Sequence, residues 1–105
     1  GVSFQYSERI GCRQVKCFLT RITELYNAMS GFLEECLSLM GVPKGVSYDA
    51  LSYTEQLRFN ICNKLDSDGY ADIDLRHFDK KTRDRVIHAL AVLAKKYGVW
   101  YAFTL

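Results

Sequence analysis

A repeated apolar pattern between residues 15 and 40 constrains the fold of this 105-residue chain more than any other feature. Three sets of apolar residues recur there every seven positions: Val15, Ile22, Met29 and Cys36; Phe18, Leu25, Phe32 and Leu39; Leu19, Tyr26, Leu33 and Met40. Heptad spacing places such residues on one broad stripe of an α-helix. The pattern predicts one long helix from about residue 9 to residue 40, with a kink or break at Ser30-Gly31 and a stop at Gly41.

A second helix is predicted after the loop at residues 41–51. Ser52-Tyr53-Thr54-Glu55 has the form of a capping box, in which the serine and glutamate side chains satisfy exposed backbone N–H groups. The apolar stripe of this helix is formed by Leu57, Ile61 and Leu65. Asp66-Ser67-Asp68-Gly69 is typical of the turn that ends such a helix.

A third helix and three short strands complete the prediction. Asp79 is a good N-cap for the helix, and Gly98 is a natural stop. Strands are indicated at residues 2–6, at 70–75 and, most clearly, at 99–105, where aromatic and β-branched residues dominate. We therefore expect a single domain, 1–105, of the α+β class and predominantly helical. Its long N-terminal helix and two further helices would pack on a small two- or three-stranded sheet that includes the C-terminal strand.

Composition and cysteine spacing bear on location and chemistry. The net charge is only +2, and no apolar run approaches the roughly 20 residues of a membrane span. The four cysteines, at positions 12, 17, 36 and 62, form neither a C-x-x-C motif nor a zinc-like cluster with histidine. Reduced, buried thiols fit this pattern best. We expect a soluble, cytoplasmic protein without a metal or cofactor.

The acidic stretch from Asp66 to Asp74 invites comparison with a calcium-binding loop. With Asp66 at the first position of an EF-hand, Asp68 falls correctly at the third. However, Tyr70, Ala71 and His77 then occupy the positions of a ligand, the required glycine and the bidentate glutamate. We expect no tight calcium binding here.

A basic segment surrounds the start of the third helix. It contains Arg76, His77, Lys80, Lys81, Arg83 and Arg85. Cations at a helix N-terminus oppose the helix dipole, and the nearby Asp79 and Asp84 offset only part of this charge. A solvated, salt-bridged helix face and a binding site for an acidic partner both remain open as explanations.

Catalytic signatures are missing from the sequence. No nucleophile motif or glycine-rich phosphate loop is present, and the only histidines are His77 and His88. The aromatic share of 13% and the wide apolar stripe suggest a contact surface, although the other elements could cover that stripe. We predict a small non-enzymatic regulatory or adaptor protein that binds another protein, with a homodimer as one form. The alternative is a nucleic-acid-binding regulator that uses the basic start of the third helix. The candidate partner-binding residues are Arg76, Lys80, Lys81, Arg83, Arg85, Trp100 and Tyr101.

Overall fold

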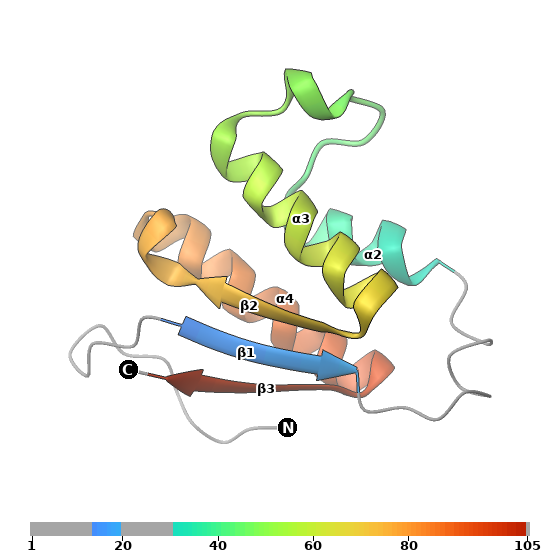
Figure 1. Ribbon diagram of the computed structural model, residues 1–105, viewed down its shortest axis with the longest axis vertical. Coiled ribbons are helices and arrows are strands. Elements are labelled where there is room, and N and C mark those ends of the chain that lie inside the picture. Colours follow the sequence, from blue (N-terminus) through green and yellow to red (C-terminus); the bar gives the residue numbers. More distant parts are fainter. Residues whose placement is uncertain (1–13, 20–30, 105) are drawn as a thin grey trace.

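The computed structural model describes residues 14–19 and 31–104, and these form an α+β fold with three α-helices and a three-stranded antiparallel sheet (Figure 1). The elements, in chain order, are β1 (Gln14–Leu19), α2 (Phe32–Leu39), α3 (Tyr53–Asp68), β2 (Tyr70–Asp74), α4 (Lys80–Tyr97) and β3 (Val99–Thr104). Short 3₁₀ helices lie at Tyr48–Ala50 and Leu75–His77. The α+β prediction is confirmed, with β1 as the central strand in the order β2-β1-β3.

The single helix predicted from residue 9 to residue 40 is not confirmed. Residues 14–19 form a strand instead, and α2 begins only after Gly31. Along β1, Val15 and Cys17 are fully buried while Lys16 between them is exposed, which is the alternation of a strand. Residues 20–30 and the strand expected at residues 2–6 lie outside the described residues.

The predicted ends of the two later helices are confirmed where they depend on local capping. Ser52 N–H donates to Glu55 Oε1 at 2.8 Å, and Glu55 N–H donates to Ser52 Oγ at 3.3 Å, which completes the capping box of α3. Asp79 accepts a hydrogen bond from Thr82 N–H at 2.8 Å and caps α4. α3 continues to Asp68, however, so the predicted turn at 66–69 is reduced to Gly69.

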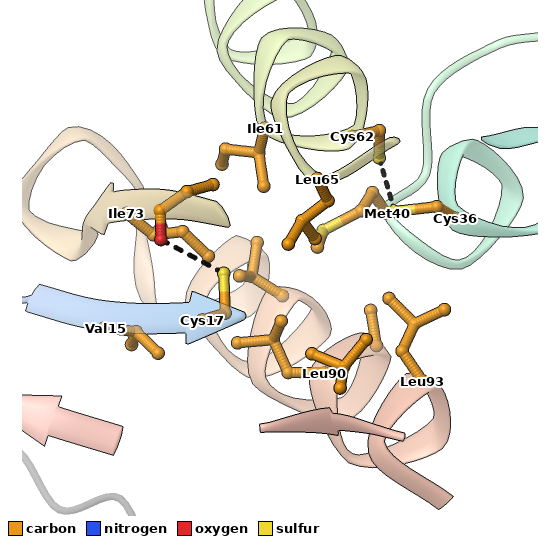
Figure 2. Close-up of a cluster of buried hydrophobic side chains, with 14 of the residues drawn as sticks. Val15, Cys17, Cys36, Met40, Ile61, Cys62, Leu65, Ile73, Leu90 and Leu93 are labelled. Carbon is orange, nitrogen blue, oxygen red and sulfur yellow. Dashed lines mark hydrogen bonds between the residues drawn. The ribbon is translucent and has the colours of Figure 1, made fainter. Parts of the chain in front are cut away.

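The helices cover one face of the sheet, and the core lies between them and the inward-facing side chains of the strands (Figures 1 and 2). α3 packs against β2, α4 packs against β3, and α2 contacts both helices. The fully buried side chains include Met40, Leu65, Ile73, Leu75, Leu90 and Leu93. None of the helices in the described residues is both long enough and apolar enough to cross a membrane.

Three of the cysteines belong to this core. Cys17 on β1, Cys36 on α2 and Cys62 on α3 are fully buried and unpaired by disulfides. Figure 2 shows Cys36 and Cys62 pointing toward each other, and the Cys36 thiol donates a hydrogen bond to Cys62 Sγ at 2.8 Å. This hydrogen bond and burial raise the pKa of Cys62. Both side chains are fully buried and pack as small core residues.

Candidate functional site at the outer face and open edge of the sheet

Three aromatic rings cross the outer face of the sheet in one row. Phe18 on β1 lies opposite Tyr70 on β2 and opposite Trp100 on β3. The ring centroids are 5.4 Å apart for Phe18 and Tyr70, and 5.5 Å apart for Phe18 and Trp100. Trp100 is 48% exposed and Tyr70 is 37% exposed. The helices cover the opposite face, so this row presents large apolar surface to solvent, as protein contact surfaces do.

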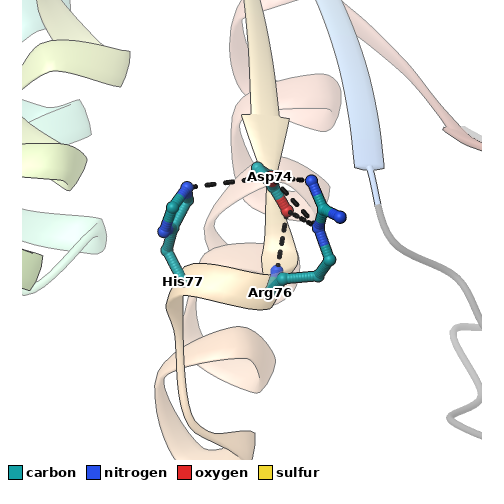
Figure 3. Close-up of polar contacts among 3 residues, drawn as sticks. All are labelled: Asp74, Arg76 and His77. Carbon is teal, nitrogen blue, oxygen red and sulfur yellow. Dashed lines mark hydrogen bonds and ion pairs between the residues drawn. The ribbon is translucent and has the colours of Figure 1, made fainter.

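Polar groups beside the row are bonded to one another. The Tyr70 hydroxyl donates to Asp72 Oδ2 at 2.6 Å, and this hydrogen bond to a carboxylate raises the pKa of Tyr70. At the end of β2, Arg76 Nη2 donates to Asp74 Oδ2 at 2.7 Å, while His77 Nε2 lies 3.7 Å from the same oxygen (Figure 3). The hydrogen bonds from Arg76 lower the pKa of Asp74 to about 2, so this carboxylate stays ionised near neutral pH.

β2 is an edge strand, since β1 is its only neighbour among the described residues. Leu19 N–H of β1 donates to Gly69 C=O at 2.9 Å. This hydrogen bond sets the ladder register and shows which backbone groups of β2 face β1. Because bonding alternates along an antiparallel ladder, Ala71 and Ile73 direct their N–H and C=O groups toward β1. Those of Tyr70, Asp72 and Asp74 therefore point to the open edge. Such a row of backbone groups can pair with an added strand.

A groove of about 260 Å³ runs beside this edge, between β2 and α3. Its apolar walls are formed by Leu57 and Ile61 of α3, by Ala71 and Ile73 of β2, and by Phe78. Asn60, Lys64, Asp72, Asp74 and His77 contribute the polar part of the lining. The edge of the sheet and an apolar depression thus lie next to each other.

The basic segment predicted as a binding site is largely satisfied internally. Arg76 pairs with Asp74, and Lys80 Nζ lies 2.9 Å from Asp84 Oδ2. The other two arginines donate to backbone carbonyls, Arg83 to Phe78 at 3.2 Å and Arg85 to Leu39 at 3.3 Å. Lys81 is exposed on the first turn of α4. Arg76 and Lys80 of this segment thus form salt bridges, and its role as a partner-binding site stays a prediction.

The two aromatic residues predicted as partners of the basic segment do not lie beside it. Tyr101 is 6% exposed and faces the core, so it offers no ring to a ligand. Trp100 follows the C-terminal end of α4, whereas the basic segment surrounds its start. Arg85, the last residue of the segment, lies 12 residues before Tyr97 at the end of α4, which is about 18 Å along the helix axis. The structure instead joins Trp100 to Phe18 and Tyr70, which sequence reasoning missed because strand register is not local.

The acidic stretch 66–74 is divided among different elements. Asp66 and Asp68 lie in the last turn of α3, Asp72 lies on β2, and Asp74 pairs with Arg76. Across residues 14–19 and 31–104, no three acidic, histidine or cysteine side chains gather as metal ligands would.

Comparisons of the chain with protein-family models, with curated proteins and with solved structures found no match, so the function has to be inferred from the geometry of the site.

Proposed function

We propose that this protein is a small non-enzymatic adaptor that binds another protein by adding an extended segment of that partner to the open edge of β2. The observation that carries the proposal is the edge itself. The N–H and C=O groups of Tyr70, Asp72 and Asp74 face away from β1 and lie next to an apolar groove. Main-chain hydrogen bonds supply affinity in strand addition, and pockets for alternate side chains supply specificity.

The two sides of the added strand would meet different surroundings. Side chains on the inner side enter the groove and contact Leu57, Ile61 and Phe78. Side chains on the outer side lie next to Tyr70 and Asp72, beside the aromatic row. The exposed Asp72 carboxylate favours a lysine or arginine opposite it, since opposite charges on paired strands attract. The partner segment therefore alternates apolar and basic residues.

A second copy of this chain fits the edge less well than a different protein. If β2 paired with its own copy about a two-fold axis, in the register that matches all five residues, Asp72 would face Asp72. Like charges directly opposite each other destabilise a strand pair. We therefore propose a different protein as the partner, and the experiments below can detect a homodimer through β2.

Selection from a random linear peptide library tests strand addition without knowledge of the natural partner. Asp72→Pro removes the backbone N–H that points to the edge, and an edge position tolerates proline because no ladder bond is lost. Asp72→Ala keeps the N–H and is the matched control. We expect selected peptides to alternate apolar and basic residues, to bind the alanine variant, and to lose at least tenfold in affinity for the proline variant.

Hydrogen exchange then locates the bound peptide. Binding should slow exchange of the amides of residues 70, 72 and 74, while those of Ala71 and Ile73 should change little because they already face β1. Circular dichroism must show that the proline variant is folded. Peptides that bind the folded proline variant unchanged, or that leave the edge amides unprotected, would refute strand addition at β2. If the protein forms a concentration-dependent dimer and Asp72→Pro abolishes it, the strand that pairs with β2 comes from a second copy of this chain and not from another protein.

The aromatic row favours one other function, the binding of single-stranded nucleic acid. Bases stack on exposed rings of a sheet, and Phe18, Tyr70 and Trp100 are arranged for this. The charges favour it less, because Lys16 on this face is accompanied by Asp72. Fluorescence anisotropy with single-stranded DNA at two salt concentrations tests this alternative. Micromolar affinity that falls with salt and is lost in Trp100→Ala would make nucleic acid the better answer.

A further inference from the structure

A second and larger cavity lies away from the β2 groove, at the C-terminal end of α2. Its volume is about 580 Å³, within the range of small-molecule sites. The chain after α2 forms one side of it, turning at Gly41 and Gly45, both of which have φ of +77°. The apolar lining comes from Leu37, Val42, Pro43, Val46, Leu51 and Phe59. We call this space the α2-end cavity.

Two arginines from different helices converge on Gly41, which lines this cavity. Arg58 of α3 is only 8% exposed and donates from Nη1 to Met40 C=O at 2.8 Å. Arg85 of α4 lines the cavity and donates from Nε to Leu39 C=O. A Cβ atom built on Gly41 would lie 2.6 Å from Arg85 Nε and 3.1 Å from Arg58 Nη1, so both guanidinium groups lie over this glycine.

The positive charge at this point is incompletely balanced. Within the described part of the chain, neither Arg58 nor Arg85 forms an ion pair with a carboxylate. Their hydrogen-bond partners are backbone carbonyls: Leu39 and Met40 at the end of α2 and, for Arg58 Nε, Thr54 of α3 at 3.0 Å. The carbonyls at a helix end carry only about half a negative charge. Burial is the largest cause that lowers the pKa of Arg58, and the charge of Arg85 acts in the same direction, while the carboxylates of Glu55 and Asp79 offset part of this effect. At the rim, Lys44 adds a positive charge and Glu34 a negative one.

We propose that the α2-end cavity binds a small organic anion with an apolar body. The anionic group, a carboxylate, sulfonate or phosphate ester, contacts Arg85 and Lys44. The apolar body packs against Leu37, Val42 and Phe59. Arginine forms strong charge-assisted hydrogen bonds with such oxygens, and the carbonyl at Leu39 uses only one of the Arg85 donors. This site is separate from the β2 edge and does not depend on strand addition.

A fluorescent probe pair tests the proposal with the folded protein. Anilinonaphthalene sulfonate is an apolar anion, and phenylnaphthylamine is its uncharged analogue. We expect saturable binding of the sulfonate that weakens by at least about tenfold in Arg85→Gln, because one charge-assisted hydrogen bond is lost. Lys81→Gln removes a cation from the same helix outside the cavity and should leave affinity unchanged. Phenylnaphthylamine should bind the protein and the Arg85 variant equally.

Two further measurements place the probe. Its titration should shift the amide resonances of Gly41 and Gly45, and Ser38→Phe, which projects a ring into the cavity, should abolish binding of both dyes. Trp100→Ala should have no effect, which separates this site from the aromatic row. Near-ultraviolet circular dichroism must show that each variant keeps its packed core. Equal loss of sulfonate affinity in Lys81→Gln, full binding in folded Ser38→Phe, or loss in Trp100→Ala would each overturn the proposal.

Discussion

Replacing Gly41 with alanine separates backbone strain from steric collision, because the chain contains a matched control. Gly41 and Gly69 both have left-handed backbones, with φ of +77° and +76°. A Cβ atom at Gly69 would meet nothing within 4 Å, whereas one at Gly41 would meet Arg85 and Arg58. Any loss of stability that Gly41→Ala shows beyond Gly69→Ala therefore measures the packing of the guanidinium groups.

The expected magnitudes follow from three contributions. A left-handed alanine is destabilised by roughly 1–2 kcal/mol relative to a right-handed one. Alanine recovers about 0.4–1 kcal/mol because its unfolded chain has less freedom than that of glycine. Gly69→Ala should therefore lose about 1 kcal/mol. At Gly41 the Cβ also displaces the hydrogen bond of Arg85 Nε to Leu39 C=O, and one such bond of a charged group is worth about 1.5–3 kcal/mol. We expect a total loss of about 3 kcal/mol.

Thermal and urea denaturation can resolve this difference. For a domain of this size, 1 kcal/mol corresponds to a shift in Tm of about 4–8 °C, so Gly41→Ala should melt about 10 °C below Gly69→Ala. Arg85→Ala removes the atoms that collide first, and the double variant should lose less stability than the sum of the two single variants. Equal losses in the two glycine variants, with additive effects in the double variant, would show that the guanidinium groups do not lie over Gly41.

Three further outcomes follow from other parts of the structure. Phe32→Ala should lower the free energy of unfolding by about 3–5 kcal/mol in urea denaturation, because the ring is buried and a cavity would remain. A loss below about half a kcal/mol would contradict this packing. Arg76 lowers the pKa of Asp74 from 3.8 to about 2, so this carboxylate contributes stability above pH 4 that is lost as the pH falls toward 2. Asp74→Asn should therefore flatten that part of a plot of the free energy of unfolding against pH. Burial raises the pKa of Cys17 to about 12, and Cys36 and Cys62 are fully buried, so these three cysteines should react slowly with a thiol reagent in the native state. In denaturant the reagent should titrate all four cysteines of the chain, and a count of two would indicate a disulfide.

The helix ends could be predicted from the sequence because the interactions that fix them are local. The Ser52 and Glu55 side chains bond across three residues, and Asp79 reaches Thr82 over the same distance. These contacts need no knowledge of the rest of the fold. The α+β class followed from the same local signals together with the aromatic C-terminal strand.

The sequence did not predict β1 because this short segment fits both the seven-residue repeat of a helical stripe and the two-residue alternation of a strand. Val15 and Phe18 fall on the heptad stripe, while Val15, Cys17 and Leu19 alternate as a strand does. The choice between them is made by partners far along the chain, since Lys16 lies opposite Asp72 and Ala102. The aromatic row and the open edge of β2 depend on the same register, so the sequence could not indicate them.

The state of the charges is the reason why we propose the edge of β2, and not the basic segment, as the docking surface. An acidic partner that engaged Arg76 or Lys80 would have to replace Asp74 or Asp84, which already hold these cations at 2.7 and 2.9 Å. Exchanging one exposed ion pair for another gains little free energy. The outward backbone groups of β2 take no part in the ladder with β1, so an added strand can pair with them without breaking a hydrogen bond of that ladder. Burial of an apolar side chain in the adjacent groove then adds to affinity, at roughly 25 cal/mol for each Å² of apolar surface removed from water.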